Sequence, residues 1–495
     1  MAEDGPIAGM NVQAGSDSGT GGALRLMQLA CLVLVAIKAA HLALAGVFMD
    51  EAYYWMWGQH PALSYYDHPP LNAWLLALSS ALLGPGLPGL RLPVALTFVA
   101  DIAAFYFISR RIAGNGWPAH FWPTLLLFLT MPVFTMVSNY ALPDHVLVAT
   151  ALWAIYFFFR FFQDRAAGAA GQDRDLMLGA LFLGLAGLSK YNAAFLGLGI
   201  VLYVLWRDRA LLGQWRLWLA GTLALALQGP VVMWNLTQRF ASWNYILDDR
   251  HQGVGTLFGG VLPFFLALLI VVSPFVLWPM LRFAIARSAA PGLGFARASF
   301  VLSTLSIVGL SGVTLTLFHW NILAYLAAVP FLALYMRPRW LLALQGLWGG
   351  ALAAALFVNY AIMPITDVAG WRDQATAWSY GWPDVAQAVA AARSEHGAGF
   401  VAAADYTTAS LLGFAMGDAD VVSLAARRDQ FDYWFDAAAH AGQDAILYGD
   451  SWKPIPEAIR RQFDTVAEIA RFEVAAGRPL NTQIVYLARG FRPGS

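Results

Sequence analysis

Residues 24–71 read LRLMQLACLVLVAIKAAHLALAGVF followed by MDEAYYWMWGQHPALSYYDHPPL, and this stretch decides the fold. Its first part, Leu24–Phe48, is an apolar run of membrane-spanning length. Asp50 and Glu51 follow at once, where a helix would leave the bilayer, and a third acid comes later in the same loop. Acids among tyrosines and tryptophans at a membrane surface indicate chemistry on a substrate that is part lipid and part polar.

The composition is that of a membrane protein. The chain has 495 residues, of which 59% are hydrophobic and 12% charged, with a mean hydropathy of +0.57, whereas soluble domains carry about 25% charged residues. The formal net charge of +0 gives no basic excess, so we expect no nucleic-acid partner. No Walker loop, GxGxxG, HExxH or paired CxxC motif occurs where it would count, so we expect no nucleotide cofactor.

Apolar runs separated by charged or Pro/Gly breaks predict about eleven transmembrane helices in residues 23–362. The predicted spans are 24–48, 91–109, 118–137, 145–162, 176–189, 193–206, 216–236, 257–281, 298–318, 320–336 and 340–361. The fifth and sixth spans are short, and we expect them to form a broken hairpin around Lys190. Residues 1–22 lack apolar periodicity and are predicted to be a disordered tail.

Charge predicts the orientation of the spans. If the N-terminus is cytoplasmic, arginine is concentrated on the inner loops, as the positive-inside rule requires. The Asp50–Pro70 loop, Asp144 and Lys190 then lie on the outer side, together with everything after about residue 362.

Residues 363–495 are predicted to form a soluble α/β domain, because charges return and short elements alternate. The expected elements are a helix over Asp384–His396, a strand over Phe400–Tyr406, a helix over Thr408–Met416, strands over Val421–Leu424 and Ala445–Tyr448, a helix over Pro456–Phe463, and a final pair of strands.

Three groups are candidates for chemistry in the membrane part: Asp50 with Glu51, Lys190, and Asp144. Asp50 and Glu51 are the candidate catalytic residues, because a carboxylate within hydrogen-bond reach can act as a general base on a hydroxyl; alternatively, the pair marks a helix end in the headgroups. Lys190 can neutralise a lipid phosphate or snorkel to the headgroups. Asp144 follows a proline, so it can cap a helix or face the same cavity. Lys38, deeper in the first span, is expected to pack or snorkel.

Imidazole and aromatic groups complete the candidate site. Asp67 beside His68 can ligate a divalent metal or hold a phosphate, and His251 in a later outer loop can complete a metal site; alternatively, this part of the loop is a rigid turn. His319 and Trp320 supply either belt anchors or a sugar platform. We expect the following assignment: donor phosphate at Lys190, His68 and Tyr66; substrate at Asp144, Tyr53, Tyr54, His319 and Trp320; a possible divalent metal at Asp67 and His251.

An enzyme that works on the outer side without nucleotide needs an activated donor already there, and a sugar on polyprenyl phosphate meets that need. The residues also resemble the bacterial GT-C membrane glycosyltransferases related to protein O-mannosyltransferases and lipid A aminoarabinose transferases. The matching motifs are Asp50–Trp55, Tyr65–Leu71, Leu142–Asp144, Gly187–Tyr191, Gly229–Asn235 and His319–Trp320.

This resemblance implies a role for individual residues. Asp50 matches the acid that deprotonates the hydroxyl nucleophile in protein-acceptor relatives, and Lys190 matches a lysine that holds the donor phosphate. Asp144 matches a second outer-loop acid near the donor. Asp67 matches an acid of a metal site in the aminoarabinose transferases, which have lysine where this chain has His68. Arg428–Trp434 is similar to a substrate-side motif of the outer domain.

The expected function follows from the resemblance. It is transfer of a sugar from polyprenyl phosphate to lipid A, a polysaccharide or a protein, with inversion, at the periplasmic face of the bacterial inner membrane. The C-terminal domain would also be periplasmic. Hexose, uronic acid and aminopentose donors all fit. The alternatives are a transporter or flippase of lipid-linked sugars, and a scaffold of envelope assembly.

Overall fold

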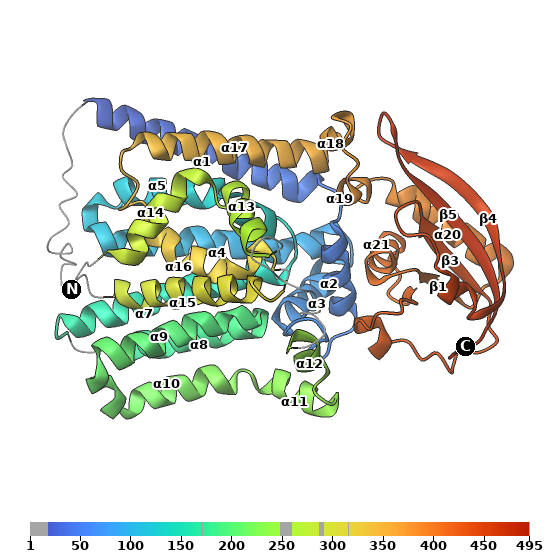
Figure 1. The fold of residues 1–495 in the computed structure, drawn as a ribbon, viewed down its shortest axis with the longest axis horizontal. Coiled ribbons are helices and arrows are strands. Elements are labelled where there is room, and N and C mark those ends of the chain that lie inside the picture. Colours follow the sequence, from blue (N-terminus) through green and yellow to red (C-terminus); the bar gives the residue numbers. More distant parts are fainter. Residues whose placement is uncertain (1–17, 170–171, 248–259, 287–291, 315, 495) are drawn as a thin grey trace.

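The computed structural model describes residues 18–169, 172–247, 260–286, 292–314 and 316–494. A bundle of long helices is joined at one end to a smaller domain that contains a sheet (Figure 1). The bundle and its end contain α1 (Ser18–Leu44), α2 (Met49–Gln59), α3 (Leu71–Leu83), α4 (Leu87–Ala113), α5 (Pro118–Thr130), α6 (Pro132–Val137), α7 (Pro143–Ala166), α8 (Asp173–Ser189), α9 (Ala194–Arg207), α10 (Trp215–Ala226), α11 (Gly229–Thr237), α12 (Ala241–Leu247), α13 (Leu262–Val271), α14 (Pro274–Ile285), α15 (Leu293–Ser311), the 3-10 helix η6 (Phe318–Asn321), α16 (Ile322–Leu332) and α17 (Trp340–Ala361).

Each predicted span coincides with an apolar helix or a pair of helices. Among the described residues, five helices are long and apolar enough to cross a membrane, and up to seven spans result if each bent pair counts as one. The count of eleven stays a prediction, because α5, α8, α9 and α16 are shorter. The predicted span 257–281 is not straight: α13 and α14 meet at 109°. The prediction also missed α3, a short apolar helix directly after Pro70.

Small residues let the helices of the bundle approach closely, as is common between membrane helices. A Cβ on Gly349 of α17 would lie 1.6 Å from the carbonyl oxygen of Thr130 in α5, and Gln345 donates to that same oxygen at 2.7 Å. A Cβ on Gly199 of α9 would lie 2.0 Å from the hydroxyl oxygen of Ser299 in α15. Substitution by any larger residue at these glycines would push the helices apart.

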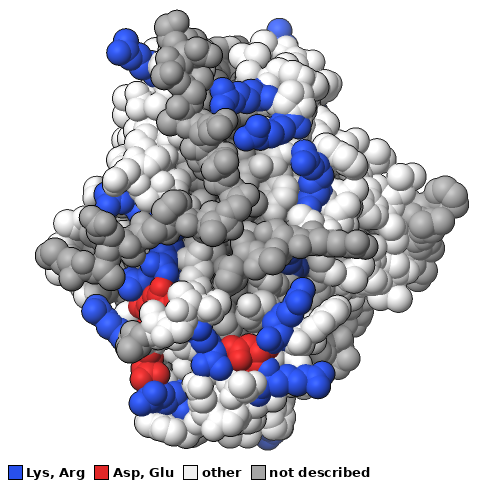
Figure 2. Space-filling model, turned by 90° about the vertical axis from the view of Figure 1, so that its left-hand side faces the viewer, with Lys and Arg blue, Asp and Glu red and all other residues white. Residues whose placement is uncertain are grey.

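The end of the bundle farthest from the sheet domain is rich in arginine. Figure 2 shows this end with many Lys and Arg side chains and few acids. The acids here are paired with arginines of neighbouring helices: Arg111 with Asp164, Arg160 with Asp175, Arg165 with Asp208, and Arg216 with Asp173. The remaining charge at this end is therefore positive.

The C-terminal domain confirms the predicted order of elements. It contains α18 (Ile365–Val368), α19 (Gln374–Ala377), α20 (Trp382–His396), β1 (Phe400–Ala403), α21 (Tyr406–Met416), β2 (Val422–Ser423), the 3-10 helix η7 (Gln430–Tyr433), β3 (Ala445–Asp450), α22 (Glu457–Arg460), β4 (Phe463–Ala475) and β5 (Pro479–Phe491). The strand order is β2-β1-β3-β5-β4; β1 is parallel to β2 and β3, whereas β5 is antiparallel to β3 and β4.

The two parts of the chain share a core. Helix α21 lies between the sheet and α2 (Figure 1). Tyr53, Trp55 and Trp57 of α2 belong to one buried cluster with Leu412 of α21 and Val485 of the sheet. The C-terminal domain therefore packs directly on the segment that carries the candidate catalytic acids.

Candidate active site

Asp50 lies in the first turn of α2, immediately beyond the end of α1. The Asp50–Pro70 segment, expected to be a loop, is thus helical as far as Gln59. Helix α2 is buried around most of its circumference, between α3 and α21, so its aromatic residues show no apolar periodicity. A carboxylate in the first turn of a helix is stabilised by the helix dipole, which favours a charged Asp50 at this position.

Glu51, the second candidate catalytic residue, is fully enclosed and paired with Arg91 of α4. Arg91 Nη2 donates to Glu51 Oε2 at 2.7 Å, and Nε lies 2.6 Å from Oε1. The backbone N–H groups of Ala141 and Phe48 donate to the same carboxylate at 2.9 and 3.3 Å. Because both oxygens are occupied by protein donors, this arrangement suits a residue that fixes the start of α2.

Asp67 lies at the junction with the C-terminal domain. Its Oδ2 accepts a hydrogen bond from the Tyr53 hydroxyl at 2.7 Å. That hydroxyl also accepts from the backbone N–H of Gln430 at 3.0 Å, and the Gln430 side chain accepts from the Tyr66 N–H at 2.7 Å. Burial, and then the Asp67 charge, raise the pKa of Tyr53 well above its usual value. Tyr53 is therefore a neutral donor that links Asp67 to η7.

Tyr406, at the start of α21, brings the two acids of this junction together. Its ring centroid is 4.6 Å from that of Tyr53. Burial raises the pKa of the Tyr406 phenol well above its usual value, and the charges of Asp50 and Asp67 raise it further. Asp50, Asp67, Tyr53 and Tyr406 thus form one cluster, called the acidic centre below.

Asp144 and Lys190 form a second cluster, the lysine centre. Asp144 is in the first turn of α7, and Lys190 directly follows α8, at the hairpin that we predicted. Lys190 Nζ donates to both carboxylate oxygens of Asp144, at 2.8 and 2.9 Å, and both residues are buried. His319 lies within electrostatic range of Asp144. The carbonyl of Trp320 accepts from Asn192 at 2.6 Å, so η6 adjoins the hairpin.

The two centres lie at the same end of the bundle and are joined by residues 138–145. Glu51 accepts from the N–H of Ala141. Asn72 of α3 donates to the carbonyl of the same Ala141 at 2.9 Å. The other end of the Asn72 amide lies 3.1 Å from His145 Nε2. We expected residues 50, 67, 144 and 190 to converge on a single cavity. The structure instead places them in two clusters, Asp50 with Asp67 and Asp144 with Lys190, which are linked by one segment.

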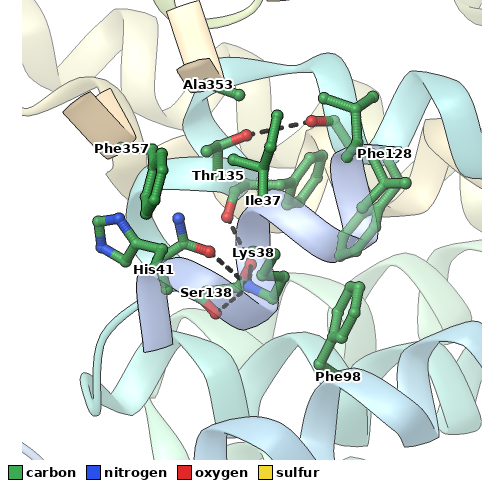
Figure 3. Close-up of a pocket in the computed structure, with 13 residues that line it drawn as sticks. Ile37, Lys38, His41, Phe98, Phe128, Thr135, Ser138, Ala353 and Phe357 are labelled. Carbon is green, nitrogen blue, oxygen red and sulfur yellow. Dashed lines mark hydrogen bonds between the residues drawn. The ribbon is translucent and has the colours of Figure 1, made fainter. Parts of the chain in front are cut away.

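Lys38 holds the beginning of this linking segment. It donates to the carbonyl and the hydroxyl of Ser138 and, at 2.6 Å, to Asn139 Oδ1. Figure 3 shows Lys38 between Phe98 and Ser138, at a cavity of about 20 Å³ that His41 and Phe357 also line. Such a volume holds one water molecule rather than a substrate. Lys38, expected to pack or snorkel, is thus an anchor for residues 138–139.

The remaining candidates lie around these centres. The ring of His68 is 6.0 Å from that of Tyr54, and both side chains are buried. Tyr66 packs against Tyr245 of α12, with 4.7 Å between ring centroids. His251, the second predicted metal ligand, lies outside the described residues.

The donor set for a metal is incomplete in the part of the chain that the structure describes. There, no three His, Cys, Asp or Glu side chains gather in a way that could hold a metal ion. Asp67 is bonded to Tyr53 instead. The divalent metal stays a prediction, and no step below passes through it.

Sequence reasoning missed several residues of the site. Arg91 pairs with Glu51, Tyr406 lies within electrostatic range of Asp50 and Asp67, and Arg427 donates to Tyr245 at the domain junction. The charged Arg91 near an apolar run was the one available signal. Nothing local in the sequence marks Tyr406 or Arg427, because their partners are far away in the chain.

The helical bundle, with acids at the end that the α/β domain covers, agrees with the GT-C fold that the sequence resemblance implied. The structure of ArnT from Cupriavidus metallidurans bound to undecaprenyl phosphate matches over 95% of this chain and 98% of its own, with a TM-score of 0.64 and 15% identity. The apo structure of the same ArnT gives a TM-score of 0.62 with 18% identity. The chain is therefore an integral membrane protein with the ArnT fold.

Sequence comparison points the same way. Residues 67–234 match the family described as dolichyl-phosphate-mannose-protein mannosyltransferase. The lipid A galacturonosyltransferase RgtD of Rhizobium johnstonii is 28% identical over 247 residues, which are 47% of this chain and 48% of RgtD. The match spans about half the length of that relative. Nothing in these comparisons supports a transporter or flippase.

Proposed function

We propose that this chain is a membrane glycosyltransferase that moves a sugar from a polyprenyl phosphate to an acceptor on lipid A, a polysaccharide or a protein. The observation that carries the proposal is the acidic centre: Asp50 at a helix start and Asp67, which accepts from Tyr53, both lie within electrostatic range of Tyr406 where the bundle meets the C-terminal domain. The ArnT fold and the family match over residues 67–234 support this reading. The relatives favour lipid A as the acceptor, since RgtD is named for it.

The reaction is a single displacement. The acceptor oxygen attacks the anomeric carbon, the bond from that carbon to the phosphate oxygen breaks, and the polyprenyl phosphate leaves. Where the acceptor is a hydroxyl, its proton passes to the Asp50 carboxylate. One displacement inverts the configuration of the anomeric carbon.

Lys190 stabilises the departing phosphate. An ammonium group has three N–H donors, and Asp144 uses two of them. The third can reach a phosphate oxygen, and an electrostatic contact of this kind lowers the barrier by a few kcal/mol. Glu51 does not touch the substrate in this scheme; with Arg91 it holds Asp50 in place.

The proposed location of the site is the periplasmic face of the bacterial inner membrane. The arginine-rich end of the bundle (Figure 2) is the end farthest from α2, the helix that carries Asp50 (Figure 1), and positively charged loops stay in the cytoplasm. The site and the C-terminal domain then both face the periplasm. Labelling of single cysteines placed at Asp384 and Arg209 with a membrane-impermeant reagent tests this; labelling of position 209 instead of 384 in intact spheroplasts would reverse it.

The test of the function is Asp50→Asn, with Asp384→Asn as a matched control. Asp384 also lies in the first turn of a helix, α20, but is exposed in the C-terminal domain. Each variant is purified in nanodiscs and mixed with polyprenyl-phosphate sugars and lipid A. We expect Asp50→Asn to lower the transfer rate by at least about a hundredfold and Asp384→Asn to match the parent. Transfer by Asp50→Asn at the parent rate would refute the role of the base.

A further inference from the structure

Arg427 lies where the C-terminal domain meets the helical bundle, on the segment that leads into η7. Its Nη2 donates to the hydroxyl of Tyr245 in α12 at 2.6 Å, and its guanidinium carbon is 5.4 Å from the centre of the Tyr245 ring. Tyr245 packs on Tyr66, which directly precedes Asp67. The tyrosine therefore fixes the plane of the guanidinium beside the acidic centre.

The electrostatic surroundings place Arg427 at the proposed reaction site. Asp67, Tyr406 and Tyr53 all lie within electrostatic range of its charge. Tyr406 in turn lies within range of Asp50. Arg427 thus adds a positive charge to a cluster whose other ionised groups are carboxylates.

Arg427 differs from the other cations near the site because it is not committed to an acid. Arg91 is paired with Glu51, and Lys190 with Asp144. Within the described ranges of the chain, Arg427 makes no ion pair, and its hydrogen bond goes to the phenol of Tyr245. A guanidinium has five N–H donors, and this one is exposed. Because only Nη2 is used by Tyr245, donors of Arg427 remain for a ligand.

We propose that Arg427 binds a carboxylate or phosphate group of a substrate held between the bundle and the C-terminal domain, and thereby selects charged over neutral substrates. This inference rests on the proposed function. A planar guanidinium matches the paired oxygens of these anions, which a lysine ammonium does not. Two sources fit this chemistry: the carboxylate of a uronic acid on the donor, or a phosphate on the acceptor lipid.

The experiment compares charged and neutral forms of each substrate. The full chain in nanodiscs receives polyprenyl-phosphate hexuronic acid or polyprenyl-phosphate hexose, with lipid A that is phosphorylated or dephosphorylated. Arg427→Gln and Arg427→Lys are compared with the parent and with Arg489→Gln, an exposed arginine of β5. Thermal unfolding of each variant checks that it is folded.

We expect Arg427→Gln to raise KM for the charged form of one substrate by about 10- to 100-fold, the range for loss of hydrogen bonds to a charged group. The KM of its neutral counterpart and kcat should stay at the parent values. Arg427→Lys should lie in between, and Arg489→Gln should match the parent. The arm that changes, donor or acceptor, identifies the source of the anion. An equal change for charged and neutral forms, or no change in either arm, overturns the proposal.

A binding measurement separates this proposal from the catalytic one. If the parent transfers none of these sugars, the proposed function fails, whereas the equilibrium affinity of each lipid for the Asp50→Asn chain can still be measured. Arg427→Gln is then added to the Asp50→Asn chain. The anion site is supported if the double variant loses affinity for one charged lipid and keeps affinity for the neutral counterpart of that lipid. Equal affinities with and without Arg427 overturn it.

Discussion

Replacing Glu51 by glutamine should separate positioning from catalysis. The carboxylate of Glu51 meets Arg91 at both oxygens and also accepts from two backbone N–H groups. Whichever oxygen becomes an NH₂ group, it will face an N–H of Arg91 and a backbone N–H. The variant thus leaves the buried guanidinium of Arg91, which is 4% exposed, without its counter-charge.

The size of the effect follows from the burial. Removing one partner of a buried ion pair destabilises a protein by about 3–5 kcal/mol, a large part of the roughly 5–15 kcal/mol by which folded domains are stable. Replacing both partners by methionine leaves no charge behind, so Glu51→Met with Arg91→Met should be more stable than either single variant. The coupling between the two sites should then reach about 2 kcal/mol or more.

Unfolding and transfer, measured on the same nanodisc preparations, check this reasoning. Glu51→Gln should unfold at a much lower temperature than the parent, whereas Asp50→Asn, at a partly exposed position, should stay within about 0.5 kcal/mol of it. If Glu51→Gln keeps the parent stability but loses transfer as completely as Asp50→Asn, the positioning argument is wrong. Glu51 would then be a catalytic residue, as its position in the sequence suggested.

Three further changes test other parts of the structure. Burial raises the pKa of Asp429 to about 7. Because the folded chain then holds this proton more tightly than the unfolded chain, the free energy of unfolding should fall as the pH rises from about 4 to above 7. Thermal melts of Asp429→Asn should lack this part of the pH dependence. Asp405 caps α21 by accepting from the N–H of Thr408 at 3.0 Å. Asp405→Ala should therefore lower the free energy of chemical unfolding by about 1–2 kcal/mol, and it should also lower the transfer rate because Tyr406 is the next residue. An unchanged free energy of unfolding would contradict the cap. Lys38→Met leaves its acceptors at residues 138–139 buried without a donor, so a loss of about 1–3 kcal/mol is expected, and a thermal melt identical to the parent would show that the anchor is dispensable.

The sequence predicted elements well where one face or one length decides the structure. Apolar runs mark the helices of the bundle. The return of charges and the alternation of short elements marked α20, α21 and the strands of the C-terminal domain. Helix α2 was missed because tyrosine and tryptophan are buried all around it, which removes the period of an amphipathic helix. Helix α3 was missed because its 13 residues are too few for a span.

The sequence picked out some residues of the candidate site, but it did not reveal their pairings. Acids beside aromatics, and a lysine between apolar runs, are local signals that picked out Asp50 and Lys190. The ion pair of Glu51 joins residues 40 positions apart, and the contact of Tyr66 with Gln430 joins residues 364 positions apart. Periodicity and spacing report only on neighbours along the chain, so such pairings appear only in the folded molecule.

The bonds between Gln430 and the two tyrosines have a consequence for biogenesis. Tyr53 and Gln430 are 377 residues apart. Nearly the whole chain must therefore be synthesised before this last contact of the acidic centre can form. Until then the nascent polypeptide lacks the contact between Tyr53 and η7, and it should be inert toward glycolipids. Truncated products that end before η7 should thus be inactive rather than act as glycosyltransferases.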